Sequence, residues 1–441
     1  MKLFKLSKIS LVVLASFAAG SASAMDLMEA YRAAQSEDAA FASAKATQLV
    51  GQEKKSQGQS LLMPTVNLTA NVTYNDTSSK FANYKSDSSG FGVNLRQPLF
   101  QQQAWIAFTE SEIQVAISEA QFEFAKNDLM LRVAQGYFEV LVAQDNVQLT
   151  DAQKKAISEQ LEQAKRNFEV GTSTITDTYE AQARYDLINA QEISAQSNLE
   201  VKRRALQQMT NKDPGLLNSL NKEIALEVPH PADIEKWVAD AQQQNIQITI
   251  ATAAAELAEK EVTRNLGGHM PTLDFVASYN KNTNNPTYFG ATNFGSTDTT
   301  VSSFGLQFNM PLFQGGATQS RYREAEANRD KAKQDLENAR RTVGVQARQA
   351  YLGVVSGISQ VKALQQALKS SESLLEASKL GQGVGVRTNI DVLNAQQQLF
   401  STRRDLYQAQ YNYLLSRLRL KAAVGTLSDD DIGGVNQALR P

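Results

Sequence analysis

Few residues of this 441-residue chain could do chemistry. It contains no cysteine and only two histidines, His230 and His269. Thiolate catalysis, disulfides, cysteine-ligated zinc and an acylated N-terminal cysteine are therefore excluded, and a histidine metal cluster or a Ser-His-Asp site has almost no residues to draw on. We find no phosphate-binding loop and no metal-ligand spacing either. The sequence predicts a protein that is not an enzyme and that holds no cofactor and no metal.

The polar pattern that stands out is Thr-x-x-Asp, which occurs twice, each time shortly after a glycine. The two pairs are Thr174 with Asp177 and Thr388 with Asp391. A threonine N-cap with an aspartate at the third helical position forms a capping box, which satisfies free backbone amides at the start of a helix. We therefore expect a helix to begin at each pair. This structural role does not exclude a second one for the carboxylates.

The overall composition excludes several classes of protein. Lys and Arg number 44 against 46 for Asp and Glu, so no excess of positive charge points to a nucleic-acid partner. Hydrophobic residues make up 42% of the chain, and the mean hydropathy is -0.36. This composition is too polar for an inner-membrane protein built from many transmembrane helices.

Residues 1–24 are typical of a secretory signal peptide. A basic start is followed by a short apolar run, Ile9–Ala19, and by an A-x-A motif that ends at Ala24. A transmembrane anchor would need about 20 apolar residues, more than this run provides. We therefore expect cleavage after Ala24 and export of the mature chain. Because no later run reaches that length, the mature protein must use strands if it meets a membrane again.

The strongest organisational signal is an internal repeat. The tetrapeptide Pro-Leu-Phe-Gln that starts at Pro98 recurs at Pro311, and nine other residues recur at a constant offset of 214. Chance would not hold one register for so long, and the period is too long for a solenoid unit. The chain is therefore a duplicated half-molecule. The nine pairs are Gly171 and Gly385, Thr174 and Thr388, Asp177 and Asp391, Ala181 and Ala395, Gln182 and Gln396, Gln196 and Gln410, Asn198 and Asn412, Arg203 and Arg417, and Leu206 and Leu420.

Proline placement separates helices from strands. The stretches 99–213 and 312–440 contain no proline, and an interior proline would cost a helix about 3 kcal/mol. We expect long helices that end at Gly171 and at Gly385, each followed by a return helix. On the last helix, large residues recur every seven positions beside small ones, which is the pattern of coiled-coil packing. The large residues are Val392, Leu399, Leu406, Tyr413 and Leu420, and the small ones are Ala395, Thr402, Ala409 and Ser416.

Two pairs of segments alternate between apolar and polar residues with a period of two, which is typical of strands. Each has roughly the 9–11 residues that a tilted strand needs to cross a bilayer. The loops between them, 76–90 and 281–300, are rich in Asn, Ser, Thr and Gly, and we expect them to be solvated. The alternating segments are 65–75, 91–96, 272–280 and 303–310.

These strands lack partners within one chain. Their polar faces are almost purely Asn, Thr, Ser and Gly, as a water-filled lumen requires, and no other strands are predicted to cover the apolar faces. Four strands cannot close a barrel, which needs about eight or more, and an open edge cannot face lipid. A closed barrel must therefore contain strands from several copies of the chain. Two copies would supply eight strands, and three copies would supply twelve and form a wider barrel. The other interpretation is two hairpins of a soluble sheet.

The expected fold is α+β, an internally duplicated protomer of long coiled-coil hairpins and four transmembrane strands. The signal peptide is 1–24. The first repeat, 25–210, has helix in 26–59, a β-hairpin at about 65–98 and a tip near 171. The second repeat, 232–425, has helix in 232–265, a β-hairpin at about 272–310 and a tip near 385. The proline-rich linker 211–231 and the C-terminal segment 426–441 are predicted to form a belt around the helices.

These features resemble the TolC family of bacterial outer-membrane efflux and secretion channels over essentially the whole mature chain. The duplication, the paired hairpins and the Pro-Leu-Phe exits match, as do two tip segments, 168–177 and 384–393. The resemblance implies a homotrimer with a twelve-stranded barrel in the lipid of the outer membrane and an α-helical tunnel in the periplasm. It also implies a passive exit duct for drugs or proteins, which docks with a periplasmic adaptor (membrane fusion) protein and an inner-membrane pump of the RND, ABC or MFS type.

The resemblance assigns a gate to the second tip. Asp391 would point into the periplasmic entrance, where three copies would form an anionic ring that selects cations and binds polyvalent ones. The family carries another acidic residue where this chain has Asn394, which removes three charges per trimer and weakens the expected cation selectivity. Arg387 would tie the second hairpin to the first through Thr176 and Asp177. The alternative for Arg387 is a solvated turn residue.

The resemblance also assigns adaptor docking to both tips. The docking candidates are Val170, Gly171 and Thr172 in the first tip, and Val384, Gly385 and Val386 in the second. The glycines have a simpler explanation as well, because tight turns between antiparallel helices use them. Where the family has a latch tyrosine, this chain has Gln382, so one lock is weakened or replaced.

The principal alternative is a secreted, trimeric coiled-coil fibre with a structural or adhesive role. Such a fibre would also be exported and rich in heptads, but it predicts no alternating strands with Asn and Thr faces. A stand-alone diffusion porin would carry all its strands in one chain, without helices of this length. An outer-membrane enzyme would need a catalytic constellation, and the sequence has none.

Overall fold

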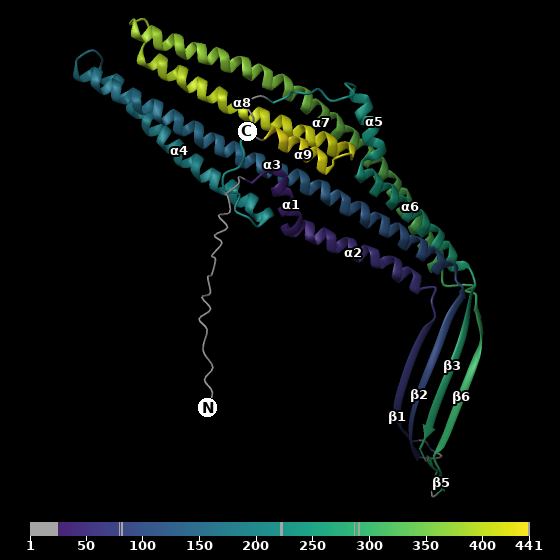
Figure 1. Cartoon of the computed structure of the whole chain (residues 1–441). Helices are drawn as coiled ribbons and strands as arrows, with labels where there is room; N and C mark the ends of the chain where they lie inside the picture. The colour runs from purple at the N-terminus through teal and green to yellow at the C-terminus, as the bar shows by residue number, and fades with distance from the viewer. Residues whose placement is uncertain are drawn as a thin grey trace, which may run out of the picture.

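The computed structural model describes residues 25–78, 80, 83–220, 224–285, 287–289 and 292–439. The molecule is long, with a four-stranded sheet at one end and two pairs of long helices that extend to the other (Figure 1). The first half contains α1 (Leu27–Glu37), α2 (Ala39–Ser60), β1 (Thr65–Ser78), β2 (Asn83–Phe100), α3 (Gln102–Glu169) and α4 (Ile175–Thr210). The second half contains α5 (Ile234–Gln244), α6 (Ile246–Leu266), the 3-10 helix η1 (Gly267–His269), β3 (Thr272–Asn284), β4 (Thr287–Phe289), β5 (Thr292–Phe294), β6 (Thr297–Asn309), α7 (Ala317–Gly383), α8 (Asn389–Val424) and α9 (Asp429–Ala438).

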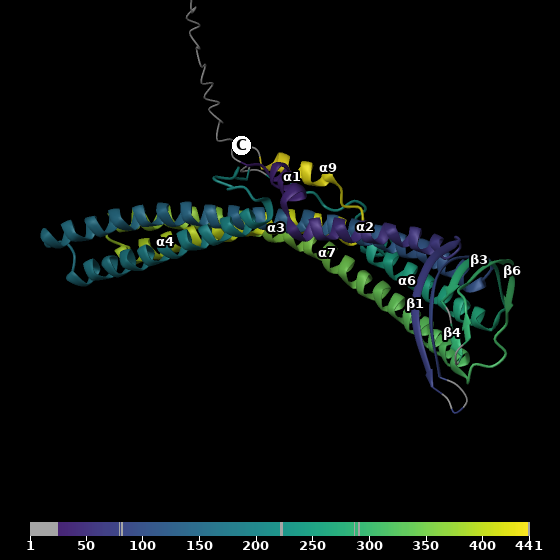
Figure 2. The same cartoon turned by 90° about the horizontal axis from the view of Figure 1, so that it is seen from below.

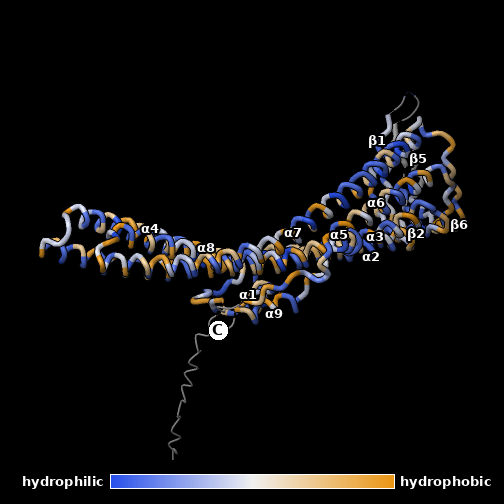
Figure 3. Tube along the Cα trace, turned by 90° about the horizontal axis from the view of Figure 1, so that it is seen from above, coloured by the Kyte–Doolittle hydropathy of each residue, from blue (hydrophilic) through white to orange (hydrophobic). Residues whose placement is uncertain are grey.

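The long helices occupy the proline-free stretches. α3 has 68 residues and α7 has 67, and at about 1.5 Å per residue each spans about 100 Å. α4 packs back along α3, and α8 along α7, so that each half ends in an antiparallel helical hairpin. Hydrophilic residues recur along all of these helices (Figure 3), and no helix in the described ranges is long and apolar enough to cross a membrane.

The helical stretch that leads into each β-hairpin consists of two helices. α1 ends and α2 begins at Asp38, while α5 ends and α6 begins at Asn245. Both residues are extended and cap the helix that follows. The Asp38 side chain accepts from the amide of Phe41 at 2.7 Å, and that of Asn245 accepts from the amide of Gln247 at 2.8 Å. A short polar side chain that captures the next amides in this way ends one helix and starts another, so the chain changes direction here.

The sheet has the order β1-β2-β3-β6, and every neighbouring pair is antiparallel. The helices that adjoin these strands in the chain pack in the same order, α2-α3-α6-α7. Each strand is therefore continued by a helix at the same position across the molecule. β1 and β6 are the two edges of the sheet.

The strands are longer than the sequence predicts. β1 and β2 pair as far as Ser78 and Asn83, and β3 and β6 as far as Asn284 and Thr297. In the chain segment that connects β3 to β6, β4 and β5 form a separate antiparallel pair. The expectation of loops over 76–90 and 281–300 is therefore wrong for most of both segments, because most of their described residues lie in strands. Threonine, which has a high β-propensity, recurs in 281–300, and the polar residues of both segments continue the ladder where the apolar alternation has ended.

Apolar side chains lie exposed on the edge strands. On β1, Val66 and Leu68 are 63% and 73% exposed, and on β6, Phe304 and Leu306 are 84% and 66% exposed. Exposure of this much apolar surface on one sheet marks an interaction with a partner or a membrane.

The main core lies near the middle of the molecule. There α1 and α9 lie together on one side of the long helices (Figure 2) and pack with parts of the linker against α3, α7 and α8. The Leu27 amide donates to Asn436 Oδ1 at 3.0 Å, which joins α1 to α9. The predicted coiled-coil seam of α8 is buried, since its five large residues are at most 8% exposed.

Asp145 of α3 is buried in this core and accepts a hydrogen bond from the Tyr411 hydroxyl of α8 at 2.7 Å. Burial raises the pKa of Asp145 from its ordinary 3.8 to about 6, although the Tyr411 hydrogen bond acts in the opposite direction. The folded protein therefore holds this proton more tightly than the unfolded chain. The stability that protonation contributes is fully present below about pH 4 and is lost as the pH rises through about 6.

We expect Asp145→Asn to stabilise the protein at pH 7.5, by about 3 kcal/mol per protomer, since it removes a buried charge and keeps an acceptor for Tyr411. Thermal unfolding followed by circular dichroism in detergent should show a higher Tm than the unsubstituted protein at pH 7.5 and nearly the same Tm at pH 4.5. Asp151→Asn is the control, because Asp151 is exposed on the same helix and pairs with Lys155. A lower Tm for Asp145→Asn at pH 7.5 would contradict this account.

Candidate functional site at the helix tips

Both tips are built by the same turn. The amide of Thr172 donates to the Asn167 carbonyl at 2.8 Å, and the amide of Val386 donates to the Gly381 carbonyl at 2.8 Å. These six-to-one bonds close Schellman motifs, which require a left-handed residue just past the helix end. Gly171 has φ 75° and Gly385 has φ 77°, a region in which a side chain would be strained. Turn geometry alone is thus enough to explain both glycines.

The predicted capping boxes are present at both return helices. In the first tip, Asp177 Oδ2 accepts from the Thr174 amide at 3.0 Å, and the Asp177 amide donates to Thr174 Oγ1 at 3.3 Å. In the second, Asp391 Oδ2 accepts from the Thr388 amide at 2.9 Å, and the Asp391 amide donates to Thr388 Oγ1 at 3.2 Å. The two tips are therefore near copies in their backbone and caps. Their differences lie in the side chains around them.

Asp391 is held as an anion. Its pKa is lowered chiefly by the hydrogen bond from the Thr388 amide, then by the Thr388 hydroxyl, and to a smaller extent by the positive charge of Arg387. Arg387 Nη1 lies 3.7 Å from Asp391 Oδ1, while Oδ2 takes both Thr388 hydrogen bonds. Asp391 remains 36% exposed, so a mobile cation can still approach it.

Arg387 lies across the end of α7, over Gly381. Its amide donates to the Gly381 carbonyl at 3.1 Å, and a Cβ on Gly381 would come within 2.7 Å of Arg387 Cγ. Gly381 thus makes room for the arginine, a role that nothing in the local sequence pattern indicates. Within the described part of one chain, Arg387 makes no hydrogen bond or ion pair with Thr176 or Asp177. Thr176 itself is exposed in the first turn of α4.

The two other predicted gate residues have partners on different elements. Gln382 Nε2 donates to Asn389 Oδ1 at 3.3 Å, across the turn that separates α7 from α8. Asn394 is exposed, and its Oδ1 accepts from Arg184 Nη2 of α4 at 3.0 Å. Arg184 was not among the predicted site residues, because nothing in its neighbourhood on α4 distinguishes it from any surface arginine.

The docking candidates form two exposed apolar tips. Val170 is 73% exposed, Val384 is 76% exposed and Val386 is 80% exposed. Gly171, Thr172 and Gly385 between them are exposed as well. Isolated exposed valines need no explanation, but these lie at the extreme ends of both hairpins (Figure 1).

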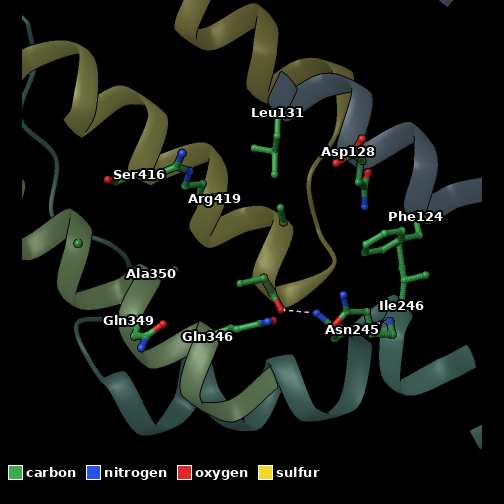
Figure 4. A pocket seen from close by; sticks show the side chains of 15 residues that line it. Phe124, Asp128, Leu131, Asn245, Ile246, Gln346, Gln349, Ala350, Ser416 and Arg419 are labelled. Carbon is green, nitrogen blue, oxygen red and sulfur yellow. Dashed lines mark hydrogen bonds between the residues drawn. The ribbon is translucent and has the colours of Figure 1, made fainter. Parts of the chain in front are cut away.

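A hollow lies between the helices near the middle of the molecule. This cavity of about 460 Å³ is lined from α3, α7, α8 and the start of α6. Asn245 Nδ2 donates there to the Ala423 carbonyl at 2.7 Å, so that the start of α6 is joined to the end of α8 (Figure 4). Its charged lining residues are Asp128 and Arg419. In the ranges that the structure describes, no group of three or more His, Asp or Glu side chains could hold a metal ion.

One predicted site residue, the signal-cleavage position Ala24, lies outside the described residues.

Comparison with known proteins agrees with this architecture. The family model "Outer membrane efflux protein" matches residues 30–212 and 237–426. Outer membrane protein TolC of Vibrio cholerae is 34% identical over 95% of this chain and 94% of its own length. Alkaline protease secretion protein AprF of Pseudomonas aeruginosa is 30% identical over 93% of this chain and 86% of its own.

Among solved structures, the Campylobacter jejuni CmeC outer membrane channel superposes with a TM-score of 0.78 at 16% identity, and covers 94% of this chain and 89% of its own. At that identity it shows the shared fold. Two matched segments that take in both halves, together with relatives similar over nearly the whole chain, establish that this protein belongs to the outer membrane efflux protein family.

Proposed function

We propose that this protein is the exit duct of tripartite efflux pumps and type I secretion systems in the outer membrane. The observation that carries the proposal is the four-stranded sheet, which exposes apolar side chains and whose outer strands β1 and β6 each pair on one side only among the described residues. Such edges cannot face lipid, because every unpaired backbone group there costs several kcal/mol. Pairing β6 of one copy with β1 of the next satisfies both edges, and three copies close a twelve-stranded barrel.

Pairing β6 of one copy with β1 of the next would also bring the helices of the three copies together into a tunnel. Because the helices pack in the strand order, α7 of one copy would meet α2 and α4 of the next wherever β6 meets β1. The three copies would then form a continuous helical wall of about 100 Å below the barrel. In this assembly the described parts of the linker and of the C-terminal segment, 211–220, 224–231 and 426–439, would form an outer belt with α1, and residues 1–24 would be removed on export.

The tips would serve as gate and docking site. Three copies of Asp391 would make an anionic ring at the periplasmic entrance, weaker than a ring with a second acidic layer because Asn394 is neutral. Arg387, with Gln382 near it, would hold the second tip closed against Thr176 and Asp177 of the first. The exposed valines at both tips would bind a periplasmic adaptor, which connects the duct to an inner-membrane pump of the RND, ABC or MFS type.

Several observations support transport over the fibre. A coiled-coil fibre has no use for a sheet with an exposed apolar face, whereas a membrane channel requires one. The family model named for outer-membrane efflux matches residues 30–212 and 237–426, and the relative named for alkaline protease secretion matches 93% of this chain, which supports both kinds of cargo.

Single-channel recording of the detergent-purified mature protein in a planar bilayer tests the proposal. We expect small, cation-selective currents that divalent or trivalent cations block. A large, unselective and permanently open pore would retain the barrel and reject the gate. Failure to insert, with a folded trimer in detergent, would contradict the exit duct and favour the fibre.

A further inference from the structure

The two helical hairpins of one protomer are each held together internally, but they are joined to each other mainly through α8. Lys154 of α3 pairs with Glu192 of α4 at 2.5 Å, and Arg403 of α8 pairs with Glu372 of α7 at 3.1 Å. These ion pairs lie within one hairpin each. Any movement of the α7/α8 hairpin away from the α3/α4 hairpin leaves them intact and breaks only the contacts between hairpins.

Three polar contacts between the hairpins follow one another down α8. The first two link α8 to α3: Arg419 donates to Gln135 at 3.2 Å, and Tyr411 donates to Asp145 at 2.7 Å. The third, made by Arg184 of α4, lies in the first turns of α8, nearest to the tip. Of these three, it is the one that a separation of the tips would break first.

Arg184 makes this third contact as a fork. Its Nη1 donates to Gln397 Oε1 at 2.7 Å, and its Nη2 donates to Asn394 Oδ1 at 3.0 Å. Residues three apart share one face of a helix, so the two amide oxygens present neighbouring acceptors. A planar guanidinium matches two such acceptors at once, and a lysine ammonium does not. The contact therefore fixes the rotation of α8 as well as its distance from α4.

An apolar cluster also joins the hairpins at this level. Leu393 of α8 packs on Ile157 of α3 and Ile188 of α4, which form a small buried cluster. Beside it lies a cavity of about 30 Å³ lined by Arg184, Leu393, Gln397 and others. Within the described residues, the buried Gln396 Oε1 at its wall has no hydrogen-bond partner. The apolar cluster thus keeps the hairpins in contact, and the two hydrogen bonds of Arg184 fix the rotation of α8 beside it.

We propose that Arg184 is a positioning residue of the gate, which holds α8 against α4 of the same protomer and so keeps the Asp391 ring closed. The inference rests on the proposed function, since it needs a gate to hold. Asp391 lies one turn before Asn394 on α8. Widening the ring by an outward movement of α8 must therefore break both hydrogen bonds of the fork.

Conductance of the purified trimer in planar bilayers tests this role. We expect Arg184→Ala to raise the mean conductance several-fold, and Arg184→Lys to raise it by nearly as much, because lysine cannot satisfy both oxygens. The double substitution Asn394→Ala with Gln397→Ala should act in the same direction and add little to Arg184→Ala, since both remove the same contact. Arg403→Ala is the control; it removes an ion pair within one hairpin and should leave conductance unchanged.

A reversible cross-link separates gating from general destabilisation. Because the chain has no cysteine, Arg184→Cys with Asn394→Cys introduces only two thiols per protomer, which a cleavable bifunctional thiol reagent of arginine length can join. We expect high conductance before cross-linking, a return to the unsubstituted level after it, and high conductance again after reduction. A merely structural defect would not follow this cycle.

The outcomes distinguish this inference from the function on which it rests. If Arg387→Ala opens the channel but no Arg184, Asn394 or Gln397 variant does, the Arg184 role is wrong and the gate stands. If none of these variants changes conductance and the cross-link has no effect, the gate itself is wrong. If the unsubstituted protein forms no channel, the exit duct fails.

Discussion

Asp391→Asn should weaken block of the channel by trivalent cations by about 100-fold or more, because a single substitution removes three charges from the trimer. At an effective dielectric constant near 20, unit charges 4 Å apart attract by about 4 kcal/mol, and a trivalent ion would interact with all three carboxylates. Asp391 is charged at neutral pH, since the Thr388 amide and hydroxyl lower its pKa. Asparagine keeps an oxygen for the Thr388 amide, so the helix cap should survive.

The matched control for this prediction is Asp177→Asn. Asp177 occupies an almost identical capping box in the other tip, with hydrogen-bond distances within 0.1 Å of those of Asp391. Titration of block in planar bilayers, with each variant beside the unsubstituted protein, should show a large loss for Asp391→Asn and a smaller one for Asp177→Asn, which keeps the capping oxygen but weakens the proposed contact with Arg387. Equal effects would mean that the cap or the Arg387 contact, and not the ring, is responsible; undiminished block in Asp391→Asn would remove the ring altogether.

Arg387→Ala should raise the conductance of the closed channel several-fold. The first tip has Ser173 at the equivalent position, so the arginine is not needed to form this turn. Within one chain its charged partner is Asp391 at 3.7 Å, a distance that leaves most of the guanidinium donors available. We propose that in the trimer these donors reach Thr176 and Asp177, and that their loss frees the second tip.

Two further variants sharpen the Arg387 test. Arg387→Lys keeps the charge near Asp391 but loses the planar fork, and it should give an intermediate conductance if hydrogen bonds hold the tip. Lys379→Ala removes a positive charge from the same end of α7 and should leave conductance as it is. Unchanged conductance in Arg387→Ala would show the arginine to be a solvated turn residue.

Local rules in the sequence account for most of the fold. The absence of proline over 99–213 and 312–440 permits helices of 68 and 67 residues. Period-two alternation locates the four long strands. A glycine followed by Thr-x-x-Asp locates both tips, because a Schellman turn and a capping box are each formed by residues within one short segment. The five large residues of the predicted seven-residue seam of α8 are likewise buried.

Other features depend on residues that are distant in the chain, and no local sequence pattern predicts them. Arg184 bonds to residues 210 and 213 positions away, so the sequence of α4 shows it only as one arginine among several. Asp38 and Asn245 divide helical stretches whose polarity alone does not reveal a break. Glycine is needed at position 381 because the side chain of Arg387 lies over it, and a Cβ there would collide with Arg387 Cγ.

The sequence by itself determined the repeat, the elements and the turns, because each follows from interactions within a few residues or from the period of the hydrophobic pattern. Only the tertiary structure decided that the strands lie in the order β1-β2-β3-β6, that the helices follow the same order, and that Arg184 of one hairpin grips α8 of the other. These arrangements arise when whole faces of helices and sheet edges meet, and the free energy of such contacts depends on which surfaces the folded chain brings together.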